Sequence, residues 1–223
     1  MVFPVIKVET GVTLLGGGNS TPAMVSQALT QAKTLVAADG GAQIALDLGH
    51  MPDAVIGDFD SLDSKARTAI EASRFYHIPE QNSTDFEKCL TRIEAPYLLG
   101  VGFLGARVDH ELAVLNAVVR HHERKIVLLG THDICVHLTS PLSIRLPIGT
   151  RVSLFPLSRV TGRSVGLTWP IESIEFAPDG RGGTSNEACE TRVDIEMDGD
   201  GMLLFLPVEA LDALLRALGI KAL

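Results

Sequence analysis

The stretch TLVAADGGAQIALDLG, residues 34–49, contains the pattern that decides the fold. Its first five residues, TLVAA, form an uninterrupted apolar run that predicts a buried strand, and DGG supplies a turn directly after it. The following residues end in a glycine and predict a short helix. A strand followed at once by a helix is the repeating unit of an α/β sheet with parallel strands.

The same strand–turn–helix unit recurs on both sides of this stretch. Further strands are predicted at 12–15, 54–57, 74–78, 97–105 and 125–130, and further helices at 21–32, 64–73, 84–93 and 109–122. Nearly continuous apolar strands that alternate with helices indicate a parallel sheet covered on both faces. We therefore expect an α/β fold whose N-terminal domain, residues 1–139, contains a Rossmann-like parallel sheet.

The rest of the chain has a different texture. Short strand-like pieces, separated by Pro, Gly and Ser, are predicted at 143–147, 151–157, 173–177, 191–198 and 202–207. The segments GRSVGLTWP (162–170) and APDGRGGTSNEA (177–188) are expected to be connections, and Asp198–Gly199 a hairpin turn. We predict a small all-β sandwich domain over 140–223, which ends in an amphipathic helix at 208–218.

Composition excludes several classes of protein. The chain has 223 residues, 46% of them hydrophobic, with a net charge of −8. That charge argues against binding to nucleic acid, and no basic cluster suggests a membrane surface. An acidic protein that binds anions must do so locally, through a few placed cations, backbone amides or metal. The three separated cysteines fit neither a zinc site nor a disulfide framework, and no signal peptide or membrane span is evident, so we expect a cytoplasmic protein.

Polar turns follow the predicted strands of the first domain. They are GGGNS (16–20), ADGG (38–41), GDFDS (57–61), QNSTDFEK (81–88) and GARVDH (105–110). In a parallel sheet ligands bind beyond the carboxyl ends of the strands, so these turns are expected to converge. GGGNS opens a helix and could hold a phosphate on its amides, or be an ordinary tight turn, since it matches neither a Walker A loop nor GxGxxG.

GDFDS places two acids one residue apart. On an extended chain Asp58 and Asp60 point to the same side, about 6–7 Å apart at Cα, and can face one Mg²⁺ while Phe59 packs inward. The sequence does not match an EF-hand loop. The structural alternative is that Asp60, Ser61 or Asp63 caps the next helix, which explains one of these side chains but not the crowding of acids.

STDFEK also has two interpretations. Thr84 and Glu87 match a capping box, which predicts only a helix start. Asp85 and Lys88 lie three residues apart, so both project from one side of the first turn and would suit a metal-bound phosphate.

GARVDH places a cation before a helix. Asp109 is a plausible N-cap, and the buried stripe of the helix is expected to contain Leu112, Leu115 and Val119. Arg107 has no evident structural role there, and a guanidinium at this place fits bidentate phosphate binding.

Taken together these motifs resemble one family. ADGGA, HMPDAVIGDFDSLD, STDFEKCL and GARVDHELAVLNAV, in that order, are similar to thiamine pyrophosphokinases, and VGLTWPI and GGTSNEA continue the resemblance to about residue 206. The resemblance implies transfer of the diphosphate of ATP to the hydroxyl of thiamine, with Mg²⁺, which gives thiamine diphosphate and AMP. It also implies a homodimer with the active site between subunits, an ATP-binding N-terminal domain and a thiamine-binding β-sandwich.

The resemblance assigns roles residue by residue. The expected catalytic residues are Asp58, Asp60, Asp85, Lys88, Arg107 and Asp109, with Asp58, Asp60 and Asp85 at the metal. The resemblance also places Asp39 and Gln81 among the ATP-binding residues, and Trp169, Ser185 and Asn186 at thiamine. The turns GGGNS and ADGG themselves add Gly18, Asn19 and Gly40 to the expected ATP-binding residues. Two features depart from the family pattern: Ala106 replaces a glycine beside Arg107, and the final helix extends beyond the usual terminal strand.

Three other functions remain open from the residues alone. A diphosphokinase for a pterin alcohol would leave VGLTWPI and GGTSNEA unused. A DxD-type glycosyltransferase would explain GDFDS but not STDFEK and GARVDH. A non-catalytic sensor of thiamine or nucleotide would bind both ligands without turnover.

Overall fold

The computed structural model describes residues 3–220, which form two compact units. The first contains the described residues up to Ala117 together with Arg124–Thr131, and the second contains Val118–Glu123 and the described residues from His132 onward. The functional division at residue 139 stays a prediction. None of the helices within the described range has the length and hydropathy that a bilayer-spanning segment requires.

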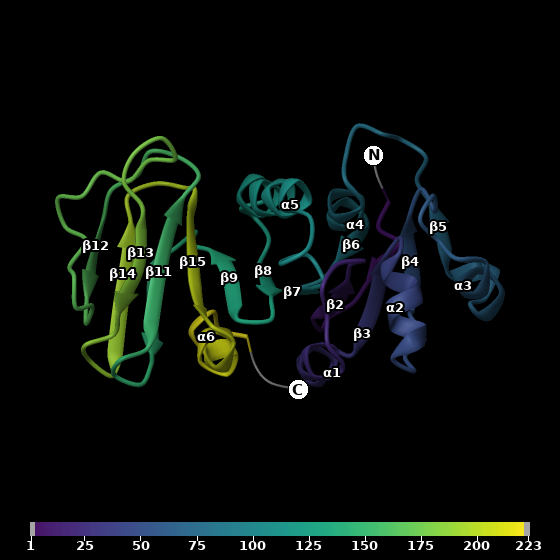
Figure 1. The fold of residues 1–223 in the computed structure, drawn as a ribbon, viewed down its shortest axis with the longest axis horizontal. Helices are drawn as coiled ribbons and strands as arrows, with labels where there is room; N and C mark the ends of the chain where they lie inside the picture. The colour runs from purple at the N-terminus through teal and green to yellow at the C-terminus, as the bar shows by residue number, and fades with distance from the viewer. Residues whose placement is uncertain (1–2, 221–223) are drawn as a thin grey trace. The chain divides into compact units, whose positions relative to one another are not determined.

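The first unit contains the α/β part of the chain. Its strands β8, β7, β2, β3, β4 and β5 lie side by side in that order, and every adjacent pair is parallel (Figure 1). The α/β class predicted from the alternating pattern is confirmed. The strands are β2 (Val12–Leu15), β3 (Thr34–Ala38), β4 (Ala54–Gly57), β5 (Phe75–His77), β7 (Leu98–Val101) and β8 (Ile126–Leu129).

Helices follow these strands as the sequence predicts, and short elements join them. The helices are α1 (Pro22–Gln31), α2 (Gly41–Asp47), α3 (Ser64–Ala69), α4 (Asp85–Arg92) and α5 (Val108–Arg120), with a 3₁₀ turn η1 (Ala72–Arg74) and a small parallel pair of β1 (Ile6–Lys7) with β6 (Ile93–Glu94). Strands β2, β4, β7 and β8 are buried at every position, because a parallel sheet is covered on both faces.

Three predictions about the helices are wrong. The helix expected over 64–73 ends at Ala69, since the buried Ile70 adopts an extended conformation. Helix α5 begins at Val108, so Asp109 lies in its first turn and is not its N-cap. Leu112 is 57% exposed; the buried positions are Val114, Leu115, Ala117 and Val118, a stripe shifted around the helix from the one expected.

The second unit contains two antiparallel sheets. One has the strand order β13-β11-β15-β9 and the other β10-β14-β12. Consecutive strands from β9 to β15 alternate between the two sheets, so no two consecutive strands of this series pair with each other. The strands are β9 (Asp133–His137), β10 (Leu142–Arg145), β11 (Arg151–Pro156), β12 (Gly162–Val165), β13 (Gly183–Glu187), β14 (Arg192–Met197) and β15 (Met202–Pro207).

The expected helix at the chain's end is divided into η2 (Val208–Ala210) and α6 (Leu211–Ala217). Leu211, Leu214 and Leu215 are buried, as their helical spacing predicts, and α6 contacts β10. The sequence therefore predicted the apolar face of this helix correctly.

Three predictions for the second unit are wrong. Strands β12 and β13 lie in the segments expected to be connections, and their mixed polar sequences hid them. Conversely, 173–177 is not a strand: Phe176 is fully buried but makes only isolated bridges. Asp198–Gly199 is not a hairpin turn, because β14 and β15 belong to different sheets. The side chain of Asp198 instead accepts a hydrogen bond from Thr161 Oγ1 at 2.7 Å.

The glycine pair after β3 has a steric role that can be tested. A Cβ at Gly41 would lie 2.1 Å from the carbonyl oxygen of Leu15, whereas at Gly40 the nearest atom would be 3.7 Å away. We expect Gly41→Ala to lower the free energy of unfolding by about 2–3 kcal/mol or more, because backbone must move. Gly40→Ala is the matched control and should change it by less than about 1 kcal/mol. Equal denaturant midpoints for both variants would contradict the close packing of α2 on β2.

Candidate active site

Three aspartates meet beyond the ends of two adjacent parallel strands. Asp39 follows β3, and Asp58 and Asp60 follow β4. One carboxylate oxygen from each lies within 4.8 Å of the others. The expectation that turns at the strand ends converge is therefore met for these two turns.

Asp39 is the buried member of this acidic cluster. Its Oδ2 accepts a hydrogen bond from the backbone N–H of Ser61 at 3.2 Å, whereas its Oδ1 is buried and has no hydrogen-bond partner among the described residues. Burial raises the pKa of Asp39, and the charge of Asp85 raises it further. A buried carboxylate oxygen without a donor is costly unless a cation binds it, so the geometry fits a metal site.

The two acids of GDFDS are brought together by a turn. Phe59 has a φ of +65°, so the segment is not extended as expected. Its ring is buried against Phe75 and His77, with both ring centroids 5.4 Å away, which confirms the inward packing of this side chain. A non-glycine residue in the left-handed region is strained, and the packing of the ring offsets the strain.

Hydrogen bonds order the turn and separate capping from site residues. Asp58 Oδ1 accepts from the backbone N–H of Asp60 at 3.3 Å, and Ser61 Oγ donates to Asp60 Oδ1 at 2.9 Å. Asp63 is the N-cap of α3 and accepts from Lys65 N at 3.0 Å. Capping therefore accounts for Asp63 and leaves Asp58 and Asp60 to be explained. Ser61 forms hydrogen bonds with two of the three acids, whereas its place in the sequence suggests only a helix cap.

Lys88 lies beside the cluster as a buried cation. Its side chain is 2% exposed, and Nζ lies 2.8 Å from Asp58 Oδ2 and 3.0 Å from Asp85 Oδ1. The hydrogen bond from Lys88, with a second from Gln81 Nε2 at 3.0 Å, lowers the pKa of Asp58 to about 2. Burial lowers the pKa of Lys88, but hydrogen bonds to both carboxylates outweigh it, so the net shift is upward. Lys88 is thus charged at neutral pH.

The capping box that opens α4 positions this cation. Thr84 Oγ1 accepts from Glu87 N, and the Glu87 carboxylate accepts from Thr84 N, as predicted. Asp85 and Lys88 then project together from the first turn. The capping box is therefore confirmed, and binding of a metal-bound phosphate by Asp85 and Lys88 stays a prediction. In the acidic cluster, Asp39 joins Asp58 and Asp60 as the third acid, where the sequence predicts Asp85. The metal role of Asp85 stays a prediction.

The GGGNS loop lies against the loop after β7. Gly18 N donates to Gly102 O at 2.9 Å, and the Asn19 side-chain amide donates to Gly105 O. A Cβ at Gly18 would lie 2.6 Å from Gly102 O, so only glycine fits there. These contacts explain the sequence of the loop as a tight turn and leave phosphate binding by Gly18, Asn19 and Gly40 as a prediction.

Arg107 is engaged by its own neighbour. Its NH2 lies 2.7 Å from Asp109 Oδ2 and its Nε 3.2 Å from Asp109 Oδ1, and both side chains are well exposed. This pairing raises the pKa of Arg107 and lowers that of Asp109. Surface pairs of this kind are weak, so Arg107 can exchange this partner for a phosphate at small cost.

The residues expected to bind thiamine lie together in the second unit. Asn186 is buried and holds the backbone of Trp169 from both sides: its Oδ1 accepts from Trp169 N at 3.1 Å and its Nδ2 donates to Trp169 O at 2.6 Å. The Trp169 side chain remains 59% exposed. Ser185 has a φ of +62°, and its N–H donates to Ser153 Oγ at 3.0 Å. Asn186 therefore fixes the backbone of Trp169, whose aromatic side chain is exposed.

Comparison with known proteins points to one family. A family profile described as the catalytic domain of thiamin pyrophosphokinase matches residues 25–128. Thiamine pyrophosphokinase 2 of Arabidopsis thaliana is 30% identical over 212 residues, which cover 76% of each chain. Thiamine pyrophosphokinase 1 of the same plant is 27% identical over 89% of this chain and 88% of its own.

Solved structures have the same fold. Thiamin pyrophosphokinase from Candida albicans superposes with a TM-score of 0.77 at 18% identity, over 89% of both chains. The match places this chain in the fold class of that enzyme. Given the identity to the plant proteins, the chain belongs to the thiamine pyrophosphokinase family.

The pairing of Lys88 with Asp58 predicts a measurable titration. Its stabilising effect is complete above the ordinary aspartate pKa of about 3.9 and is lost as the pH falls through about 2. In Lys88→Met we expect the pKa of Asp58 to rise to about 4 or above, measured by carboxyl ¹³C NMR. Lys65→Met, which removes an exposed lysine beside Asp63, should leave it near 2. An unchanged Asp58 pKa in Lys88→Met would show that Lys88 is not its main partner.

Proposed function

We propose that this chain transfers the diphosphate group of ATP to the hydroxyl of thiamine, which forms thiamine diphosphate and AMP. Membership of the family supports this reaction. The observation that carries the proposal is the convergence of Asp39, Asp58 and Asp60 with a buried, unpartnered oxygen on Asp39. Such a site suits the magnesium complex of a nucleotide.

The acidic cluster would hold Mg²⁺ through Asp39, Asp58 and Asp60, with Asp85 as a further predicted ligand. The ion would supply charge neutralisation for the polyphosphate. Four carboxylates against the single ammonium of Lys88 leave this region strongly negative, so a nucleotide needs a cation to approach. Because Lys88 is bound to both Asp58 and Asp85, it fixes the orientation of these two acids.

The remaining polar residues have positioning roles in this proposal. The amides of Gly18 and Gly40, with Asn19 and Gln81, would contact ATP. Arg107 would leave Asp109 to balance charge on the phosphates during transfer. Asp109 either orients the start of α5 or accepts the proton of the thiamine hydroxyl. Little covalent work falls to the protein, since positioning and charge neutralisation dominate diphosphate transfer.

Thiamine binding is assigned to the second unit. Trp169 would stack on an aromatic ring of thiamine, with Ser185 and Asn186 beside it. We further propose that the first unit is a Rossmann-like domain and that the two antiparallel sheets of the second form a β-sandwich. We also propose that the chain is a homodimer with its active site between subunits. Its proposed location is the cytoplasm.

The acidic cluster can be tested by release of AMP. We expect Asp58→Asn/Asp60→Asn to fold with an unchanged circular dichroism spectrum and to lose at least about a hundredfold in turnover with ATP, Mg²⁺ and thiamine. Asp47→Asn/Asp53→Asn removes two acids outside the site and should retain activity. Unchanged turnover of the first variant at saturating Mg²⁺ would remove these acids from the reaction.

The AMP assay, together with calorimetry and a nucleotide-sugar assay, distinguishes the other functions. AMP formed with a pterin alcohol and not with thiamine would establish the pterin diphosphokinase. Calorimetric binding of thiamine without any AMP would establish the sensor. Hydrolysis or transfer from a nucleotide sugar would establish the glycosyltransferase.

The exposed tryptophan provides a separate test of acceptor binding. We expect Trp169→Ala to raise the KM for thiamine about tenfold, because a stacking or cation–π contact contributes about 1–2 kcal/mol. Trp169→Phe retains an aromatic face and should recover most of this loss, and the KM for ATP should not change in either variant. An unchanged thiamine KM in Trp169→Ala would place the acceptor elsewhere.

A further inference from the structure

A group of three arginines lies in the C-terminal part of the chain, away from the residues of the acidic cluster. A hollow of about 420 Å³ is lined by residues of β10, β14 and α6, the helix for which the sequence suggested no function: Ser143, Arg145, Arg192, Ala213, Arg216 and Ala217. All of these lie in the second unit. No residue of the acidic cluster or of the expected thiamine site lines it.

Two of the arginines face each other across the sheet. Arg145 and Arg192 are directly opposed partners in the antiparallel pairing of β10 with β14, and Arg216 comes from α6 into the same hollow. Like charges directly opposite each other on a sheet are destabilising. A third cation at the same place increases the repulsion, so this arrangement needs an explanation beyond stability.

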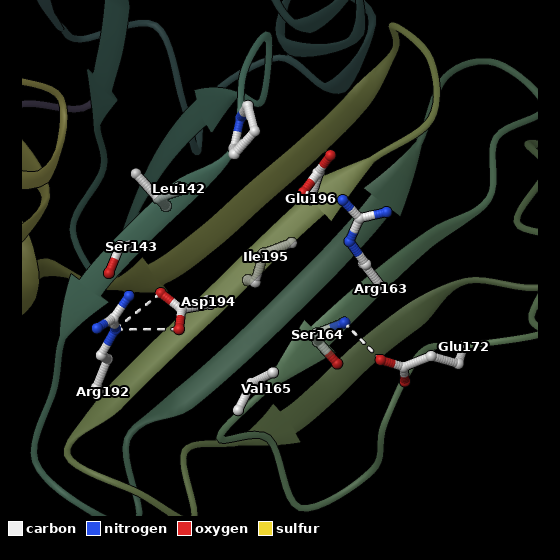
Figure 2. A pocket seen from close by; sticks show the side chains of 11 residues that line it. Leu142, Ser143, Arg163, Ser164, Val165, Glu172, Arg192, Asp194, Ile195 and Glu196 are labelled. Atoms are coloured by element: carbon white, nitrogen blue, oxygen red, sulfur yellow. Dashed lines mark hydrogen bonds and ion pairs between the residues drawn. The ribbon is translucent and has the colours of Figure 1, made fainter.

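Neutralisation within the protein is incomplete. Arg192 Nε lies 3.0 Å from a carboxylate oxygen of Asp194, and Figure 2 shows this pair beside Ser143. Within residues 3–220, no group forms a hydrogen bond or an ion pair with the guanidinium of Arg145 or of Arg216. Among the described residues, the only ion pair that an arginine of the hollow forms is that of Arg192 with Asp194. This gathering of cations contrasts with a net charge of −8 for the whole chain.

The walls suit a compact anion. Guanidinium groups bind phosphate oxygens in pairs. The exposed Ser143 lies on the same face, where its hydroxyl donates to the carboxylate of Asp194. Ala213 and Ala217 lie four residues apart on one face of α6, and their small side chains leave the hollow open. Three cations with one partly compensating acid match a ligand with two or more negative charges.

We propose that this hollow, formed by Ser143, Arg145, Arg192 and Arg216, is a binding site for a small phosphate- or diphosphate-bearing anion, separate from the candidate active site. It binds its ligand without a metal, because the protein itself supplies the positive charge. The acidic cluster has the opposite requirement, since its carboxylates repel a phosphate unless a cation is present.

The test uses calorimetry with inorganic pyrophosphate in EDTA at a fixed ionic strength of about 0.15 M. We expect pyrophosphate to bind the wild-type chain, and Arg145→Ala/Arg216→Ala to weaken the dissociation constant at least tenfold. Arg159→Ala/Arg163→Ala removes the same charge from arginines that are already paired with Glu175 and Glu196, and should retain wild-type affinity. AMP and sulfate as alternative ligands distinguish a phosphate ester from a free oxyanion.

Two further measurements separate binding from folding and from the candidate active site. In chloride, the Tm of Arg145→Ala/Arg216→Ala should be no lower than that of wild type, because a repulsive contact is removed. Pyrophosphate should then raise the Tm of wild type but not that of this variant. Ala213→Glu keeps the arginines but places a carboxylate in the hollow, and should also abolish binding. Arg107→Ala should bind normally.

Several outcomes would overturn the proposal. They are no pyrophosphate binding to wild type above that of chloride, equal affinity in Arg145→Ala/Arg216→Ala, or loss of affinity in Arg107→Ala. The last would place the ligand at the candidate active site.

Discussion

The candidate site depends on one buried ammonium group. Lys88 connects the first turn of α4 to the end of β4 by binding Asp85 and Asp58 together. Removing Lys88 would leave two carboxylates without their shared cation in a region partly shielded from water, which is costly. The pair with Asp58 also keeps that carboxylate ionised, so the cluster retains its negative charge under ordinary conditions.

The two proposed sites would bind anions in opposite ways. Around β3 and β4 the chain concentrates carboxylates, and in the proposed function a metal brings the polyphosphate close to them. Between β10, β14 and α6 it concentrates guanidinium groups, which are proposed to bind a phosphate directly. An acidic protein has no general attraction for phosphates, so each of these places must be built from a few residues in a fixed geometry.

Much of the first unit follows from sequence pattern, and less of the second. Parallel strands buried on both faces are uninterrupted apolar runs, which are easily recognised, and the capping box at Thr84 and Glu87 fixes a helix start locally. Strand β13, GTSNE, has no such run. It is a strand because it pairs with β11, and that pairing leaves no local sign in the sequence. The donor-free oxygen of Asp39 and the opposition of Arg145 to Arg192 are tertiary facts with no local signature.

The alternation of strands between the two sheets has a consequence for how the second unit forms. No strand from β10 to β15 can pair with the one made just before it, so no hairpin between consecutive strands of this unit can nucleate either sheet. Within this unit, the pairings of β9 and β10 wait for β15 and β14, whose residues lie at least 47 positions later in the chain (Arg145 pairs with Arg192). Assembly of this unit should therefore be slow and all-or-none, and a chain released before residue 202 would expose several unpaired strand edges to aggregation.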